Sequence, residues 1–123
     1  MFSLYTITTV AFCHWFFDFF LQTPEMANGK SKSNKNLMDH VMVYSIGLAV
    51  MGVLNLHILN GYQLLAFASV NSIAHFFTDF VTSRATSSLY KEERYSEFFS
   101  VIGLDQFIHY FTLFSTLNWA TTL

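Results

Sequence analysis

The chain of 123 residues has few charged residues, one cysteine and one proline. Charged side chains make up 11% of it, whereas they make up about a quarter of an ordinary globular chain. The single cysteine, Cys13, excludes an internal disulfide, and its apolar neighbours indicate a packed small side chain. Pro24 is the only residue that a helix interior would resist for lack of an amide hydrogen. The net charge of −2 and the lack of a basic tail argue against nucleic-acid binding.

Apolar and aromatic residues are correspondingly abundant. Hydrophobic residues make up 53% of the chain and aromatic residues 19%, with 15 phenylalanines. A domain of this length buries only part of its surface, so it could not hide all these rings from water. We therefore expect lipid to be the solvent for much of the surface. No serine-histidine-aspartate order, glycine-rich phosphate loop or nucleotide motif is present.

Four segments are long and apolar enough for transmembrane helices, which need about 20 residues. They are predicted at about 3–23, 37–59, 62–83 and 97–119, with breaks at Pro24 and at the Asn60-Gly61 turn signal. The first segment has neither the basic start nor the small-residue cleavage site of a signal peptide, so we expect a retained helix. The predicted fold is an all-α integral membrane bundle of four transmembrane helices in one domain, 1–123.

The basic residues predict the orientation of this bundle. All six fall in the two segments between helices one and two and between helices three and four: Lys30, Lys32, Lys35, Arg84, Lys91 and Arg94. Because loops rich in lysine and arginine stay in the cytoplasm, these loops are predicted to be cytoplasmic and both termini to lie outside.

The two halves of the chain resemble each other. At an offset of 61 residues, "HWFFDF" (14–19) matches "HFFTDF" (75–80), and at an offset of 66, "MDHVMVY" (38–44) resembles "LDQFIHY" (104–110). The offsets differ by five residues, so the second match is the weaker one. The pattern predicts two parallel-repeated helical hairpins, 1–60 and 61–123.

Histidines and aspartates recur one helical turn apart inside these apolar segments. Residues at i and i+4 lie on the same helix face, and successive helices run in opposite directions. The groups are therefore expected at similar depth, between the cytoplasmic boundary and mid-membrane. Each would cost about 2.5–3.5 kcal/mol at the bilayer centre if it faced lipid. We expect a shared interior site built from His14, Asp18, Asp39, His40, His75, Asp79, Asp105 and His109.

Imidazole and carboxylate groups without thiolates suit Zn²⁺, Mn²⁺ or iron. The hypothesis is one or two divalent ions, with the ligands His14, Asp18, His40, His75, Asp79, Asp105 and His109. A two-metal site would clamp phosphoryl oxygens and activate a water molecule, with Asp39 or Asp105 as the general base. Predicted substrate contacts are Gln22, Lys30, Lys32, Asn71, Arg84 and Gln106.

Three other interpretations stay open on these residues. Histidine–aspartate pairs also join membrane helices by hydrogen bonds without any ion. The same groups could relay protons or bind a permeating cation, as in a small channel or transporter. A third alternative is a metal-stabilised protein that binds a partner in the membrane. Four helices enclose little space, so a homo-oligomer is a further expectation.

Four stretches together resemble one family. The sequence carries "HWFFDFFLQT", "DHVMVY", "HFFTDFVTSR" and "IGLDQFIHY", which is similar to a family of small multi-pass membrane proteins of bacteria and their phages, a domain of unknown function. The resemblance spans nearly the whole chain and implies a compact helical bundle in the inner membrane. A looser similarity, to membrane-bound metal-dependent hydrolases, lies in histidines and aspartates placed in short hydrophobic helices.

The predicted function is therefore that of an inner-membrane protein with a histidine/aspartate metal site near the cytoplasmic leaflet. The predicted reaction is metal-dependent hydrolysis of a phosphorylated or lipid substrate. The expected partners are the lipid bilayer and an anionic small molecule or lipid.

Overall fold

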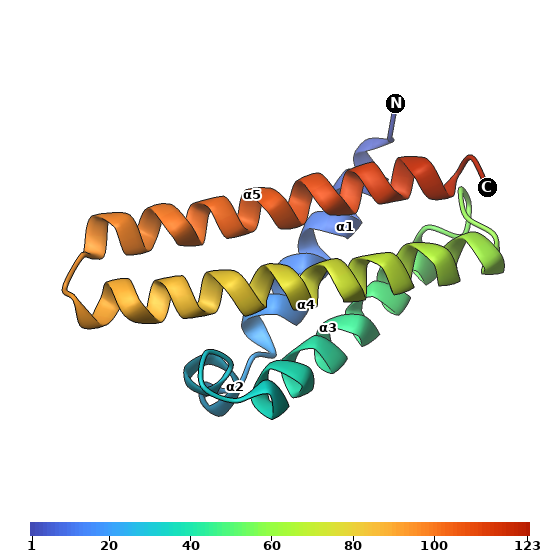
Figure 1. The fold of residues 1–123 in the computed structure, drawn as a ribbon. Helices are drawn as coiled ribbons and strands as arrows, with labels where there is room; N and C mark the ends of the chain where they lie inside the picture. Colours follow the sequence, from blue (N-terminus) through green and yellow to red (C-terminus); the bar gives the residue numbers. More distant parts are fainter.

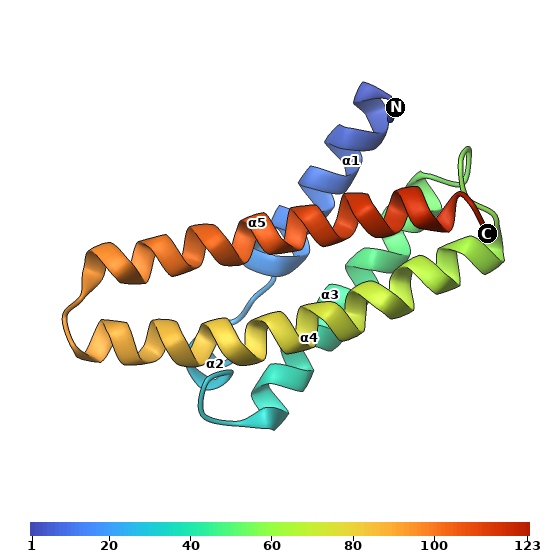
Figure 2. The same ribbon diagram turned by 45° about the horizontal axis from the view of Figure 1, so that its top comes forward.

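The computed structural model describes residues 1–123 as an all-helical chain without strands, which confirms the predicted α class. Its elements are α1 (Leu4–Trp15), the π-helical turn η1 (Phe16–Phe20), α2 (Pro24–Gly29), α3 (Asn34–Leu54), α4 (Gly61–Lys91) and α5 (Tyr95–Ala120). Helices α4 and α5 lie side by side along most of their length, and α1 and α3 cross them obliquely (Figure 1). Figure 2 shows the same arrangement turned by 45°.

Side chains just before each of the first four helices define where it begins. Thr23 accepts a hydrogen bond from the amide of Met26, and Pro24 occupies the first turn, where its missing amide hydrogen costs nothing. Asn60 and Gln63 form a reciprocal capping box at the start of α4. The predicted break at Pro24 and the predicted turn at Asn60-Gly61 thus coincide with helix starts in the structure.

Helix α4 is longer than predicted. It has 31 residues and ends at Lys91, whereas the sequence predicted a helix to about 83 and then a loop. Residues 84–91 contain neither glycine nor proline, so nothing ends the helix there. The actual turn is residues 92–94, where Glu93 has a φ of 58°. Hydrogen bonds from Arg94 to Glu97 and Glu92 close this turn and raise the pKa of the Arg94 guanidinium.

Helices α3 and α4 are long and apolar enough to span a membrane. The other two predicted spans correspond to α1 with η1 and to α5. That any of these helices crosses a bilayer stays a prediction, and so does the repeat of two hairpins. The short helix α2 was not predicted from the sequence.

Polar residues lie inside the bundle and large apolar residues outside it. The outer faces of α4 and α5 expose Phe77, Phe107 and Phe111, each more than 60% accessible. The buried polar residues are Thr6, His14, Asp18, His40, Asn55, Asn71, His75, Asp79, Ser83 and His109. Large exposed rings over a buried polar cluster suit a surface covered by lipid.

The apolar core fills one half of the bundle. Both termini and the α3–α4 turn lie at the same end (Figure 1). The buried apolar residues of that half are Val10, Cys13, Tyr44, Leu48, Met51, Leu59, Phe67, Leu113, Leu117 and Ala120. The histidines and aspartates come after this core along α1 and α4 and before it along α3 and α5, so they occupy the half that faces α2.

Candidate metal centre

Buried histidines and aspartates lie together in the half of the bundle near α2. They come from four segments: α1 with η1, α3, α4 and α5. Each segment contributes one or two of them. They are His14 from α1, Asp18 from η1, His40 from α3, His75 and Asp79 from α4, and His109 from α5. Each is at most 4% exposed. The structure thus brings together six residues that the sequence singled out at one-turn spacings.

One group offers four ligand atoms that all lie within 4.8 Å of one another. The Nε2 atom of His40 lies 3.1 Å from Asp18 Oδ1, 3.1 Å from His75 Nε2 and 3.2 Å from Asp79 Oδ2. His75 Nε2 lies 3.5 Å from Asp18 Oδ1 and 3.7 Å from Asp79 Oδ2. Ligands at about 2.0–2.2 Å from a tetrahedral ion stand about 3.3–3.6 Å apart. The five separations, 3.1–3.7 Å, lie close to this range, so two imidazoles and two carboxylates could hold a divalent ion here.

A second group of ligand atoms adjoins the first. His109 Nε2 lies 3.1 Å from Asp79 Oδ1 and 3.3 Å from Asp105 Oδ2. Asp79 therefore belongs to both groups, with Oδ2 facing the first and Oδ1 facing the second. A carboxylate placed in this way can bridge two ions or orient the ligands of one.

His14 lies beside these groups, although the sequence predicted it as a ligand. Its Nε2 atom lies 2.9 Å from Gln106 Oε1, and its Nδ1 atom lies 3.0 Å from the Tyr44 hydroxyl. Because an amide oxygen only accepts, His14 Nε2 donates to Gln106, and Tyr44 donates to Nδ1. Both ring nitrogens are thus in use. His14 contacts the centre through Asp18, whose Oδ2 atom lies 3.6 Å from Nε2.

Tyr44 is a site residue that the sequence reasoning did not single out. Its ring stacks on His75 with centroids 3.8 Å apart and an interplanar angle of 15°, while its hydroxyl fixes His14. Tyr44 follows His40 by four residues on α3, so the one-turn spacing used for the other residues could have found it.

The π-helical turn η1 carries Asp18 into the centre. The amide of Leu21 donates to the carbonyl of Phe16, five residues earlier, at 2.9 Å. A Cβ at Gly47 of α3 would overlap the Phe17 ring, so the absence of a side chain there lets this turn approach α3. Single π-helical turns inside α-helices occur frequently at functional sites.

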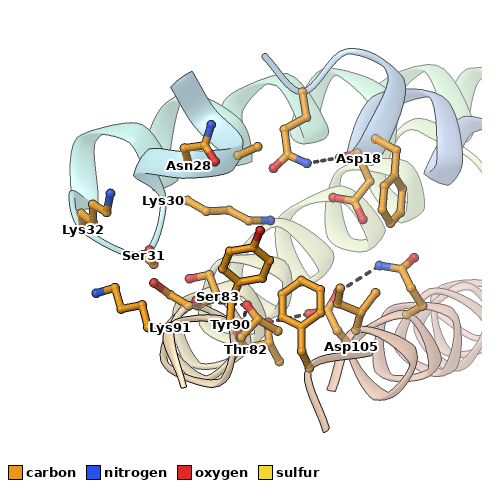
Figure 3. A pocket seen from close by; sticks show the side chains of 18 residues that line it. Asp18, Asn28, Lys30, Ser31, Lys32, Thr82, Ser83, Tyr90, Lys91 and Asp105 are labelled. Carbon is orange, nitrogen blue, oxygen red and sulfur yellow. Dashed lines mark hydrogen bonds between the residues drawn. The ribbon is translucent and has the colours of Figure 1, made fainter. Parts of the chain in front are cut away.

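A cavity of about 620 Å³ adjoins the centre on the side of α2 (Figure 3). Lys30, Lys32 and Lys91 line it together with the carboxylates of Asp18 and Asp105. Its other polar lining residues are Gln22, Asn28, Ser31, Thr82, Ser83, Thr86, Ser87, Tyr90 and Gln106. The Lys30 ammonium reaches from this cavity to Asp79 Oδ2, at 2.7 Å. The cavity thus combines cationic side chains with direct access to the carboxylates.

Asp105 and Gln106 join the cavity to the centre. Asp105 Oδ1 accepts a hydrogen bond from Thr82 at 2.6 Å, and Oδ2 accepts one from Gln106 at 2.9 Å. The other end of the Gln106 amide accepts from His14. Gln22, another predicted contact, lines the cavity and donates to the backbone carbonyl of Asp18.

Three predicted site residues lie away from both the centre and the cavity. Asp39 pairs with Lys35 at 2.7 Å, because neighbouring helix residues point about 100° apart and only His40 faces inward. Arg84 binds the Phe80 carbonyl and Asn34. Asn71 binds the Phe67 carbonyl and Thr116. A catalytic role for Asp39 and substrate contacts for Arg84 and Asn71 therefore have no support in this geometry.

The cavity residues of α4 beyond 83 were missed because the helix was predicted to end there. Ser83, Thr86 and Tyr90 continue the stripe that begins at His75 and Asp79, at intervals of three or four residues. Lys91 lies one residue further on. A longer helix prediction would have placed all of them beside the aspartates.

A family model described as "Protein of unknown function (DUF3307)" matches residues 6–123. The chain therefore belongs to this family, as its resemblance to a family of unknown function predicted. The comparisons with curated proteins and with solved structures give no significant match.

Proposed function

We propose that this member of the DUF3307 family is an inner-membrane hydrolase that holds one or two divalent metal ions in its histidine/aspartate centre. Its substrate would be phosphorylated, either a small molecule or a lipid, and would bind in the lysine-lined cavity. In this proposal α1 with η1, α3, α4 and α5 all cross the bilayer, which completes the four predicted spans.

One observation carries the proposal. Four ligand atoms within 4.8 Å of one another, one of them from Asp18 in the cavity wall, adjoin a cavity lined by three lysines. A buried polar cluster that only joined helices would not need a cavity of about 620 Å³ beside it. Lysines suit phosphoryl oxygens, and histidine with aspartate suits Zn²⁺, Mn²⁺ or iron.

The residues divide into three roles in this proposal. Asp18, His40, His75 and Asp79 hold a first ion, and Asp79, Asp105 and His109 could hold a second. A metal ion bound there would polarise a phosphoryl oxygen and lower the pKa of a bound water. Asp105 is the carboxylate best placed to accept a proton from the attacking water, because it faces both the centre and the cavity.

The distribution of basic residues supports a cytoplasmic cavity. The lysines of the α2 region and of the end of α4 lie at the end of the bundle opposite the termini (Figure 1). Under the positive-inside rule this end faces the cytoplasm.

Ion conduction is the less favoured function, because apolar residues separate the centre from the other end. A second cavity, of about 370 Å³, lies near the termini and contains His57 and Asn118. Leu48, Met51, Phe67, Leu113 and Leu117, all at most 1% exposed, fill the interior between the two. The two cavities share no lining residue, whereas a conduction path would require a continuous one.

Metal analysis of detergent-purified protein tests the proposal. Wild type is expected to carry Zn, Mn or Fe in a ratio near one or two per chain, and to hydrolyse a phosphomonoester such as p-nitrophenyl phosphate or phosphatidic acid. Chelation and His75→Ala should each abolish both metal and activity. Retained hydrolysis after complete metal removal would contradict the proposal, as would wild type without stoichiometric metal. Cation flux into vesicles would instead favour conduction.

A further inference from the structure

Lys30 binds a carboxylate oxygen that a metal ion in the centre would also bind. Its ammonium lies 2.7 Å from Asp79 Oδ2, the oxygen that Asp79 contributes to the first ligand group. The Lys30 side chain is 19% exposed and Asp79 is 1% exposed, so water screens this contact poorly. A divalent cation and an ammonium repel each other strongly at such a distance. Binding of the ion to Asp79 therefore requires Lys30 to move.

The cavity offers Lys30 a second position. Figure 3 shows the side chain extending across the cavity, from the side of Lys32 toward Asp18 and Asp105. Its four-carbon stem is flexible and begins at the C-terminal end of the six-residue helix α2. Rotation about the bonds of this stem would carry the ammonium away from Asp79 and toward Lys32 and Lys91, which line the same cavity.

This part of the cavity has the features of an anion subsite. Lys32 and Lys91 line it, and neither forms an ion pair. Ser83 also lines the cavity and is only 7% exposed, and its hydroxyl is buried without a hydrogen-bond partner. A buried hydroxyl without a partner is costly, and an oxygen of a bound ligand would satisfy it. Three ammonium groups and a hydroxyl donor suit a doubly charged oxyanion.

We propose that Lys30 moves from Asp79 to an oxyanion of the phosphate-monoester class when the centre takes up metal, so that metal and oxyanion bind cooperatively. This inference rests on the proposed function, because it assumes metal at Asp79. It adds a subsite built by Lys30, Lys32, Lys91 and Ser83, and a coupling between two ligands. By linkage, the oxyanion must strengthen metal binding by the same factor as metal strengthens oxyanion binding.

The test measures metal affinity with and without the oxyanion. Purified wild type is titrated with buffered Mn²⁺ in detergent, alone and with saturating inorganic phosphate. Phosphate is expected to tighten Mn²⁺ binding at least about fivefold, the lower end of ordinary coupling. In Lys30→Gln the phosphate effect should fall well below that of wild type, while Mn²⁺ affinity without phosphate is unchanged or higher because the competing ammonium is gone. Lys35→Gln, which changes a lysine outside the cavity, should behave as wild type.

Three results would overturn the inference. They are an equal phosphate effect in Lys30→Gln, weaker Mn²⁺ binding by that variant without phosphate, and no phosphate effect in wild type. Lys91→Gln, which leaves the Lys30–Asp79 contact in place, provides an independent reading if Lys30→Gln does not fold. It should reduce the phosphate effect and leave Mn²⁺ binding alone intact, and an undiminished effect would count against the subsite.

One further arm separates the sources of the oxyanion, and the outcomes below separate the fates of the two proposals. Nanodiscs with and without phosphatidic acid replace inorganic phosphate in this arm. Coupling with phosphatidic acid alone would assign the subsite to a lipid headgroup, and coupling with both ligands would assign it to the oxyanion itself. Failure of wild type to bind any divalent metal would remove the proposed function as well, whereas metal binding and hydrolysis without coupling would remove only the role of Lys30.

Discussion

Asp79 is the side chain on which the centre depends most. It is 1% exposed, and its oxygens contact His109, His40 and the Lys30 ammonium. No other carboxylate faces both ligand groups. Removal of its charge should therefore affect both groups together.

Asp79→Asn is expected to lower metal affinity by more than the 10- to 100-fold that is typical for loss of an outer partner of a ligand. The amide keeps the shape but offers only one weak ligand oxygen. Metal content after dialysis against a buffered ion measures the change. Asp39→Asn is the matched control, since Asp39 pairs with Lys35 outside the centre. Equal metal content in the two variants would remove Asp79 from the site.

Tyr44→Phe removes the Tyr44 hydroxyl and leaves the aromatic ring. The ring can still stack on His75, but His14 Nδ1 loses its hydrogen-bond partner inside the bundle. The variant is expected to lower the free energy of unfolding by about 1–3 kcal/mol, the cost of an unpaired buried polar group, as measured by denaturation in detergent. Tyr110→Phe is the control, because Tyr110 contacts the His14 ring but its hydroxyl binds no protein atom. Equal stability of Tyr44→Phe and wild type would contradict the assigned contact.

The sequence identified most of the centre at this scale for a simple reason. Ionisable groups in apolar helices must face inward, and spacing by one turn tells which of them share a face. Asp39 and His40 show the limit of this argument. They are adjacent at the start of α3, and composition alone could not tell which of them faces the interior.

Among the elements, η1 and the part of α3 that it contacts position Asp18. Phe17 packs where Gly47 has no side chain. An extra methyl group there would push the π-helical turn away from α3, and with it the carboxylate of Asp18. The contact therefore links a packing detail to the geometry of the centre.

Gly47→Ala is expected to destabilise the fold by about 1–3 kcal/mol, as overpacking of a filled interface does, and to weaken metal binding. Thermal denaturation in detergent and metal titration measure the two effects. Gly103→Ala provides the contrast, because a Cβ at Gly103 would meet no atom within 4 Å and alanine favours a helix by up to about 1 kcal/mol. A Gly47→Ala variant as stable as Gly103→Ala would refute the close contact.

The elements were less predictable than the residues. The predicted breaks at Pro24 and at Asn60-Gly61 were correct, because these residues influence the conformation of their own stretch of backbone. The end of α4 depends on the strained turn at Glu93. That turn contains no glycine, proline or asparagine from which it could be predicted. The π-helical turn depends on packing against Gly47, a contact 30 residues away in sequence that local patterns do not contain.

The exposed aromatic surface and the buried polar residues together predict how the whole molecule would sit in a membrane. Glu93 lies in the α4–α5 turn, and Gly61 begins α4 at the opposite end of the bundle. If α4 crosses the bilayer in the proposed direction, these two positions lie on opposite sides.

Cysteine labelling measures this directly. In a Cys13→Ala background, Glu93→Cys is expected to react with an impermeant maleimide only in inverted membrane vesicles, and Gly61→Cys only in intact spheroplasts. Both positions are exposed in the structure, so folding does not shield them. Labelling of both from the same side would rule out a crossing by α4, and the reverse pattern would invert the proposed topology.

The length of α4 has a last consequence for how a lipid would reach the protein. Its 31 residues extend about 46 Å, against about 30 Å for the hydrocarbon of a bilayer. If the span begins at Gly61, the excess falls near Thr86, Tyr90 and Lys91, which line the cavity. The cavity would then be level with the phosphates of the inner leaflet. A lipid could arrive by sideways diffusion alone, with its chains still among its neighbours and no need for extraction into water.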